Sequence, residues 1–373
     1  MHYILIIILA AVLYSFQSVY YKKNWHRHLS ATVAYNKTHA NIGEIILLTE
    51  QVKNEKLLPI PVLYVKFSTS RTFLFEDLDN AAISDHYHRN DIFSVMGQQQ
   101  ITRTLQFCTT RRGYYSTEYI NLVVNDLFMK NSYATKLENH TSLYVYPALL
   151  TNRTSLTLVN SIIGDLSKKD LYEDPLSFRG IREYTSNDSM RYINWKATAK
   201  SQQLMVNTYF DIQNTEVVLL FNLDTNIIQR DQRLQEYMIS VVATLLYHMN
   251  KKGFATRLAI NIEDPFTDET IITELGTGTE HLQSMMQILA RLDLSRNLLP
   301  FDNFIIGNES LFRNNNHNTS YLIISNYRKE SIMRSIYDRQ TEGYNVEFVC
   351  PEHSSSCVPT ANIRYWEVTS HEI

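Results

Sequence analysis

The stretch "TEVVLLFNLD", Thr215–Asp224, decides how the second half of this chain folds. It is a short, continuous apolar run that ends in an acidic residue, which is typical of one strand buried on both faces. Apolar residues at helical spacing follow it, and Gly253 after a lysine pair is a suitable place for that helix to end. A buried strand followed by an amphipathic helix predicts a strand–helix unit here.

The same alternation continues toward the C-terminus. Three more strand-like runs are separated by helical patterns: "ATRLAINI" (255–262), "SYLIISNY" (320–327) and "YNVEFVC" (344–350). This order predicts a doubly wound α/β domain, a mainly parallel sheet with helices on both faces. Functional loops of such sheets lie at the carboxyl ends of the strands, which here carry Asp224, Glu263 with Asp264, and Asn326.

The segment upstream has a different pattern. From 31 to 150, short runs rich in Val, Ile, Leu, Tyr and Thr alternate with polar turns, which predicts an antiparallel β-sandwich. Residues 151–177 are polar and charged, and we interpret them as a linker that can include a short helix. Residues 178–373 then hold a junction segment and the α/β domain, so that the chain is a multi-domain α+β protein.

The N-terminus is almost unbroken apolar sequence from Tyr3 to Tyr20, long enough to cross a bilayer core of about 30 Å. Lys22, Lys23 and Arg27 follow this run, and no positive charge precedes it. That charge order favours an uncleaved anchor over a signal peptide. We therefore expect a transmembrane helix at 1–21, a basic juxtamembrane segment at 22–30, and a single-pass protein of the cell membrane with cytoplasmic domains.

Composition narrows the classes of function. The formal net charge is -3, so nucleic-acid binding would need a local basic face. The chain has 10 glycines and no phosphate-binding G-x-x-x-x-G-K-[ST] motif, which argues against a P-loop nucleotide hydrolase. Its 3 cysteines are too few for a disulfide framework.

The junction segment "FRGIREYTSNDSMRYINWKATAK", Phe178–Lys200, combines basic and aromatic residues. We expect an extended run up to Tyr184, then a helix from about Met190 capped by Asp188 or Ser189. On that helix Arg191 and Trp195 would share a face. Either Trp195 packs into the core, with Arg191 paired to a nearby acid, or the two side chains contact a partner.

This segment resembles the signature of a bacterial family named domain of unknown function 58. The resemblance rests on the types and spacing of Gly180, Arg182, Tyr184, Asp188, Arg191, Ile193, Trp195, Lys196, Ala199 and Lys200. Two positions depart from the pattern, because Asn187 stands where the family has Gly and Lys200 where it usually has Arg. Lys200 keeps the charge but loses the bidentate guanidinium.

The resemblance implies a membrane-anchored protein whose α/β domain is similar to von Willebrand factor type A domains. It also implies partners, a MoxR-type AAA+ ATPase and a transglutaminase-like membrane protein, and it implies no catalytic activity and no cofactor. Domains of that type often hold a divalent ion through Asp-x-Ser-x-Ser. The corresponding stretch here begins with Asp224 and keeps an oxygen donor only at Asn226, so a magnesium site would be degenerate.

The leading hypothesis is therefore a membrane-tethered adaptor that binds other proteins during their assembly or maturation. One alternative is cation-dependent, adhesion-type ligand binding by the α/β domain. Another is a hydrolase using Asp224 with Glu263 and Asp264, although no catalytic motif accompanies these acids. A third is nucleic-acid binding by the basic and aromatic residues of 178–200, which Glu183 and Asp188 interrupt.

Overall fold

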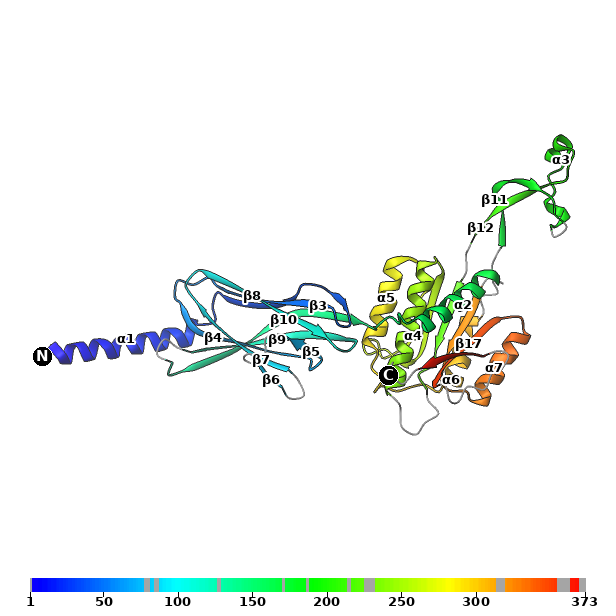
Figure 1. Ribbon diagram of the computed structural model, residues 1–373. Helices are drawn as coiled ribbons and strands as arrows, with labels where there is room; N and C mark the ends of the chain where they lie inside the picture. The colour runs from blue at the N-terminus through cyan, green and yellow to red at the C-terminus, as the bar shows by residue number, and fades with distance from the viewer. Residues whose placement is uncertain are drawn as a thin grey trace. The chain divides into compact units, whose positions relative to one another are not determined.

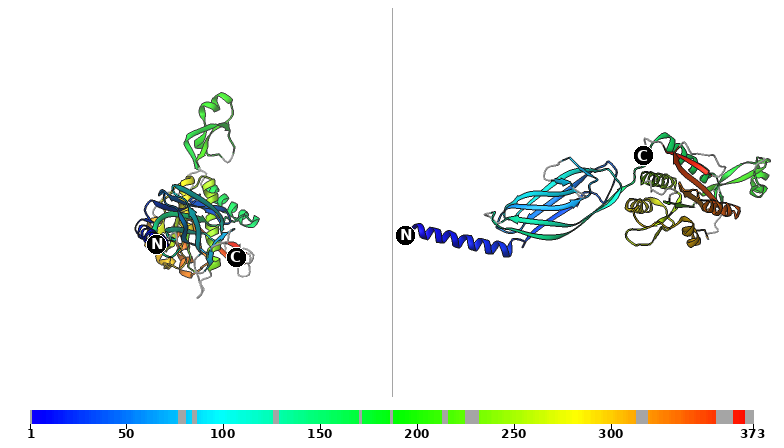
Figure 2. Two further views of the ribbon diagram at one scale, coloured as in Figure 1. Left: turned by 90° about the vertical axis from the view of Figure 1, so that its left-hand side faces the viewer. Right: turned by 90° about the horizontal axis from the view of Figure 1, so that it is seen from below.

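The computed structural model describes residues 2–76, 81–83, 87–125, 129–169, 172–185, 188–212, 216–224, 232–312, 319–353 and 363–368. The chain divides into two compact units. The first comprises Met1–Ala148 with Leu289–Arg291, and the second comprises Leu149–Ile288 with Leu292–Ile373. Each unit can be followed by colour in Figures 1 and 2.

The first unit consists of one helix and two β-sheets. Its elements are α1 (His2–Asn24), β1 (Leu29–Tyr35), β2 (His39–Asn41), β3 (Ile45–Asn54), β4 (Ile60–Thr69), β5 (Phe73–Phe75), β6 (Ala81–Ile83), β7 (Tyr87–Val95), β8 (Gln99–Thr109), β9 (Gly113–Asn125) and β10 (Ser132–Tyr146). One sheet has the order β1-β3-β8-β5 and the other β2-β10-β9-β4-β7-β6. All pairs are antiparallel except β2 with β10.

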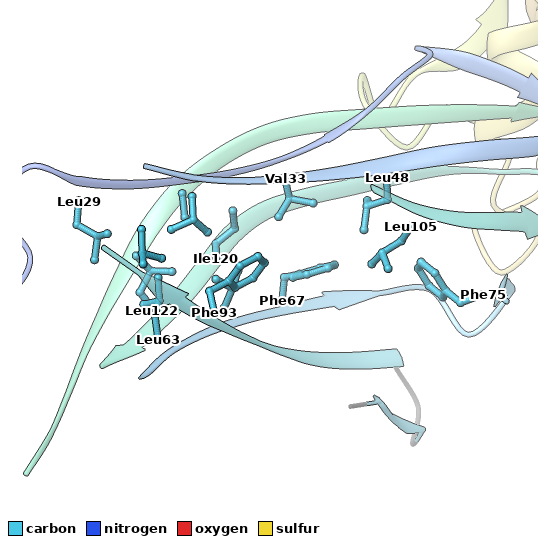
Figure 3. Close-up of a cluster of buried hydrophobic side chains, with 14 of the residues drawn as sticks. Leu29, Val33, Leu48, Leu63, Phe67, Phe75, Phe93, Leu105, Ile120 and Leu122 are labelled. Carbon is cyan, nitrogen blue, oxygen red and sulfur yellow. The ribbon is translucent and has the colours of Figure 1, made fainter. Parts of the chain in front are cut away.

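The core of the first unit lies between these two sheets. Alternate residues of the strands point inward, because successive side chains of a strand lie on opposite faces. Figure 3 shows Val33 and Leu48 from one sheet and Phe67 and Ile120 from the other gathered in the space between the ribbons. The sandwich is thus held together by burial of its inward-facing apolar side chains.

The predicted membrane anchor at 1–21 is wrong. The helix α1 forms, but among the residues described no helix is both long enough and apolar enough to cross a membrane. Tyr21, in its last turns, is buried in the sandwich core and donates its hydroxyl to the Pro59 carbonyl at 2.7 Å. Trp25 and Leu29, in the expected juxtamembrane segment 22–30, are buried in the same core. The expected single pass through the cell membrane is contradicted by the same finding.

The second unit contains a six-stranded sheet, helices on its faces, and a separate two-stranded ribbon. Its elements are α2 (Arg153–Lys169), β11 (Tyr172–Glu183), η1 (Met190–Tyr192), α3 (Trp195–Ser201), β12 (Met205–Ile212), β13 (Glu216–Phe221), α4 (Gln232–Lys251), β14 (Ala255–Glu263), β15 (Thr270–Ile272), α5 (Gly278–Arg291), α6 (Phe301–Gly307), η2 (Glu309–Phe312), β16 (Thr319–Ile324), α7 (Glu330–Thr341), β17 (Asn345–His353) and β18 (Ile363–Val368).

The large sheet has the order β15-β14-β13-β16-β17-β18, and only β15, at one edge, is antiparallel to its neighbour. β13, which lies within the apolar stretch Thr215–Asp224, is in the middle of the sheet and is buried from Val217 to Phe221. On one face of the sheet, Val218 and Leu220 pack with Phe301 and Phe304 of α6. A strand–helix alternation thus produces a doubly wound sheet, because each crossover helix must return to the same end of the sheet.

Residues 151–177, interpreted as a linker, contain more structure than expected. α2 is a helix of 17 residues, and Val159, Ile162, Ile163 and Leu166 of that helix are buried. These residues recur at the spacing of one helical face, and α2 contacts α4. The helix therefore contributes to the core of the second unit rather than connecting two domains.

Candidate functional site

The residues of the family signature lie on one structural feature, which we call the signature arm: β11, η1, α3 and β12. β11 and β12 form an antiparallel ribbon in which Arg182 is opposite Val206 and Glu183 is opposite Met205. The Tyr184 amide donates to the Leu204 carbonyl at 2.8 Å and extends the ladder by one bond. Figure 1 shows α3 at one end of the ribbon, and we call this end, the described residues between β11 and β12, the tip.

Gly180 lies in the ribbon next to an irregularity of strand pairing between Phe178 and Gly180. Its carbonyl accepts a hydrogen bond from the Thr208 hydroxyl at 3.0 Å. A Cβ atom added here would lie 3.7 Å from the Thr208 hydroxyl oxygen, which is an ordinary contact. Space alone therefore does not require glycine at this signature position.

The base of the tip is closed by an ion pair between Arg182 and Asp188. The guanidinium nitrogens Nη1 and Nη2 donate to the two carboxylate oxygens at 2.6 and 2.5 Å. The Thr185 amide and hydroxyl each donate to Asp188 Oδ2 at 2.8 Å. The Arg182 hydrogen bonds, followed by those from Thr185, hold the pKa of Asp188 well below its usual range. Asp188 thus ties the turn to the ribbon instead of capping a helix or pairing with Arg191.

The single helix expected from Met190 is interrupted. η1 ends at Tyr192, Ile193 is extended and buried opposite Val206, and α3 begins at Trp195. Asn194 causes the restart, because its side-chain oxygen accepts from the Ala197 amide at 2.9 Å and so caps α3. Its amide group also donates to Asn207 Oδ1 on β12 at 2.7 Å.

This interruption separates Arg191 from Trp195. The Arg191 guanidinium lies over the ring of Tyr192, 4.8 Å from its centroid, and donates to the Tyr192 hydroxyl at 2.9 Å. Trp195 is 70% exposed and Met190 is 73% exposed. Of the two alternatives for Trp195, packing into the core is therefore wrong, and the shared face expected for Arg191 and Trp195 does not form.

α3 has one face toward the ribbon and one toward solvent. On the inner face, the Thr198 hydroxyl accepts from the Met205 amide at 3.0 Å, and Ala197 is half-buried. On the outer face Trp195, Lys196 and Lys200 are all exposed. The structure thus places these three signature residues together, and it places Arg182, Tyr184 and Asp188 at the base of the tip.

Sequence reasoning missed Asn194, Thr198 and Met190 as parts of this site. The cap at Asn194 was detectable, since Asn before a helix-forming run is a common start signal. The contact of Thr198 depends on where β12 lies after the turn, and no local pattern reports that. Met190 is notable only for its exposure, which the sequence does not show.

The second predicted site lies at the carboxyl ends of β13, β14 and β16. Asn222, Asn261 and Ser325 are fully buried there and bond to one another, with both Asn222 Nδ2 to Ser325 Oγ and Asn261 Nδ2 to Asn222 Oδ1 at 2.9 Å. The Asp224 amide donates to Asn222 Oδ1 at 2.8 Å. This network satisfies buried polar groups and holds the strand ends together.

The structure describes only one of the two ligands proposed for a divalent ion. Asp224 follows β13, whereas Asn226 lies outside the described residues. Within the described ranges no group of three or more His, Cys, Asp or Glu side chains is placed to hold a metal ion. The degenerate magnesium site therefore stays a prediction.

One of the acids considered for a hydrolase, Asp264, has a structural role. Asp264 is 5% exposed and its carboxylate accepts from the Phe266 amide at 2.9 Å, which closes the turn after β14. The hydrolase stays an untested alternative.

Comparison with known proteins gives one family match. Residues 180–335 match the family described as "Protein of unknown function DUF58", which supports the resemblance seen in the signature. The match starts in the signature arm and runs through much of the large sheet. No curated protein matches the chain.

Several solved structures are weakly similar to part of the chain. One is the CARDB domain of a Pyrococcus furiosus protein in complex with di-metal ions, with 15% identity, a TM-score of 0.22, and coverage of 32% of this chain and 90% of that one. Another is a cohesin from Archaeoglobus fulgidus, with 12% identity, a TM-score of 0.23, and coverage of 31% and 91%. Neither likeness bears on function.

Proposed function

We propose that this chain is a binding or adaptor protein that recognises another protein through its signature arm. The observation that carries the proposal is the solvent-facing side of α3, where Trp195, Lys196 and Lys200 are exposed together. Tryptophan is enriched among the residues that supply most of the affinity in protein interfaces.

The geometry of the arm supports this role. The Arg182–Asp188 ion pair, the Asn194 cap and the Thr198 contact each fix part of the tip on the ribbon. A tip fixed in this way loses little conformational freedom on binding, which favours recognition. The match to the DUF58 model begins at Gly180 and so includes this whole tip.

We further propose that the partner is a MoxR-type AAA+ ATPase and that the large sheet is similar to von Willebrand factor type A domains. The resemblance of the signature supports the partner. The parallel order of β14, β13, β16, β17 and β18, with an antiparallel strand at one edge, supports the domain type. The chain would act by binding during assembly or maturation of other proteins, with no chemical step of its own.

Photo-crosslinking in the native host tests the proposal. A photoreactive amino acid in place of Trp195 should form a crosslink to a MoxR-type ATPase, identified by mass spectrometry. The same probe in place of Phe266, which is 53% exposed in another part of the second unit, is the control and should not. Equal crosslinking from both positions, or no ATPase product from position 195, would contradict the proposal.

A further inference from the structure

The tip of the signature arm combines apolar exposure with positive charge. We define the basic-aromatic face as Trp195, Lys196 and Lys200 of α3, all of which are exposed. Lys196 and Lys200 are four residues apart on α3 and therefore lie on the same side of the helix. Trp195 is next to them, and Leu204, where the chain turns into β12, is 43% exposed.

The charges around this face do not cancel. Between Phe178 and Met205 the sequence has five basic residues and two acidic ones, Glu183 and Asp188. Asp188 is engaged by Arg182 and Thr185 at the base of the tip. The whole chain, in contrast, has a net charge of -3, so the basic character is local to the arm.

We infer that the basic-aromatic face binds an acidic segment of a partner protein, with the Trp195 ring in an apolar pocket and Lys196 and Lys200 against carboxylates. This inference rests on the proposed function, because it specifies the chemistry of the partner surface. Charge complementarity of this kind steers association, and a buried tryptophan at the centre supplies most of the affinity.

Other occupants fit the face less well. A second copy of this chain would place the Lys196 and Lys200 of one molecule against those of the other, and like charges in an interface are costly. Nucleic-acid platforms stack several aromatic side chains, whereas α3 contributes one, Trp195, beside exposed lysines and small residues. A lipid surface is bound by long amphipathic helices, whereas α3 has 7 residues.

A peptide-binding assay with the full chain tests the inference. The probe is a fluorescein-labelled peptide of about 18 residues with Glu and Leu at helical spacing, compared with one in which every Glu is Lys. Fluorescence anisotropy should show saturable binding of the acidic peptide and not of the basic one. Because Trp25 and Trp366 are buried, the exposed Trp195 should dominate a blue shift of the protein emission on binding.

Variants show whether peptide binding depends on the basic-aromatic face or only on the net charge of the chain. The double variant K196E/K200E and the variant W195A should each weaken acidic-peptide binding by about tenfold or more, because each removes a central contact. The matched control K251E/K252E makes the same charge change at the exposed end of α4 and should bind like the parent. Circular dichroism and thermal unfolding verify that all variants fold.

The inference is overturned if the acidic and basic peptides bind equally, or if K196E/K200E binds like the parent. It is also overturned if Trp195-dependent binding occurs only with phosphatidylglycerol vesicles or only with single-stranded DNA. An ATPase crosslink at position 195 without preference for the acidic peptide would leave the proposed function standing and remove this inference.

Discussion

Two arginine–aspartate pairs, one in each unit, have the same chemistry but different structural roles. Arg89 and Asp91 on β7 form a bidentate pair at 2.9 and 3.0 Å, and both side chains are fully buried in the sandwich. Arg182 and Asp188 form a similar pair in the signature arm, where the arginine side chain is 47% exposed. The first pair neutralises charge inside a core, whereas the second holds a turn at the surface.

The buried pair belongs to a larger charged cluster. Arg103, opposite Glu50 in the pairing of β3 and β8, donates to Asp91 at 3.0 Å. Glu50 is fully buried, and neither of its carboxyl oxygens has a hydrogen-bond partner among the described residues. Burial, reinforced by the neighbouring Asp91 carboxyl, raises the pKa of Glu50 to about 8, although Arg89 and Arg103 oppose the change. The cluster therefore responds to pH, and the surface pair does not within the neutral range.

The largest expected effect is on the buried pair. The change Arg89→Ala leaves the buried Asp91 carboxylate without its bidentate partner, which should lower the free energy of unfolding by about 3–5 kcal/mol. Urea unfolding measured by circular dichroism reports it. Arg71→Ala, at an exposed position of the same unit, should change stability by less than about 0.5 kcal/mol. Similar losses from both variants would show that burial of Arg89 is unimportant.

The next effect is the pH dependence conferred by Glu50. The unfolded chain releases this proton near pH 4.5, while the folded protein holds it up to about pH 8. The contribution of Glu50 to the free energy of unfolding is therefore greatest below pH 4.5. Between pH 4.5 and about pH 8 it falls by up to about 1.4 kcal/mol per pH unit.

Glu50→Gln, which stays neutral, should remove that slope and stabilise the protein at pH 8 by on the order of 2 kcal/mol. Urea unfolding of parent and variant at pH 5, 6.5 and 8 is the measurement. A parent whose stability stays constant from pH 5 to 8 would show that Glu50 is ionised in the folded state.

A smaller effect concerns the cap of α3. Asn194→Ala removes the acceptor for the Ala197 amide and should destabilise the tip by about 1 kcal/mol, with little change in global unfolding. Faster hydrogen exchange of the Ala197 amide would report it. Asn194→Asp retains the acceptor oxygen and should protect this amide as the parent does. Unchanged protection in the alanine variant would mean that Asn194 is not the cap.

The smallest effect on global stability is expected for the surface pair. Asp188→Asn weakens the contacts to Arg182 and Thr185 but leaves the sandwich and large sheet intact, because exposed ion pairs contribute little. The depressed pKa of Asp188 means that its contribution is present above the ordinary value near 3.8 and lost as the pH falls further. Hydrogen exchange of the Thr185 amide should rise in the variant and, corrected for intrinsic rates, stay constant in the parent from pH 5 to 8. If the corrected exchange rate of the Thr185 amide in the parent changed between pH 5 and 8, the contrast between the buried and the surface pair would be contradicted.

Much of the large sheet is visible in the sequence because its strands are continuous apolar runs and α4 has a clear helical period. α2 was interpreted as part of a linker although Val159 and Ile162 begin a helical face, because its polar residues lower the average hydrophobicity. The membrane anchor was predicted wrongly because the apolar composition of α1 does not show that Tyr21 packs into the sandwich core.

The candidate site was predictable in its residues and not in its geometry. The spacing of Arg182, Asp188 and Trp195 marked the segment, but helical periodicity favoured one continuous helix. The break at Ile193 arises from a tertiary contact with Val206, which local sequence does not encode. The sequence left open whether Trp195 packs into the core or contacts a partner, and only the fold shows it exposed.

Direct binding to a purified MoxR-type ATPase from the same host tests the central claim, that the signature arm is the recognition element. Calorimetry should show that the parent chain binds the ATPase and that the triple variant W195A/K196E/K200E, with unchanged thermal unfolding, loses this binding. Equal affinity of the parent and the folded triple variant would contradict the account.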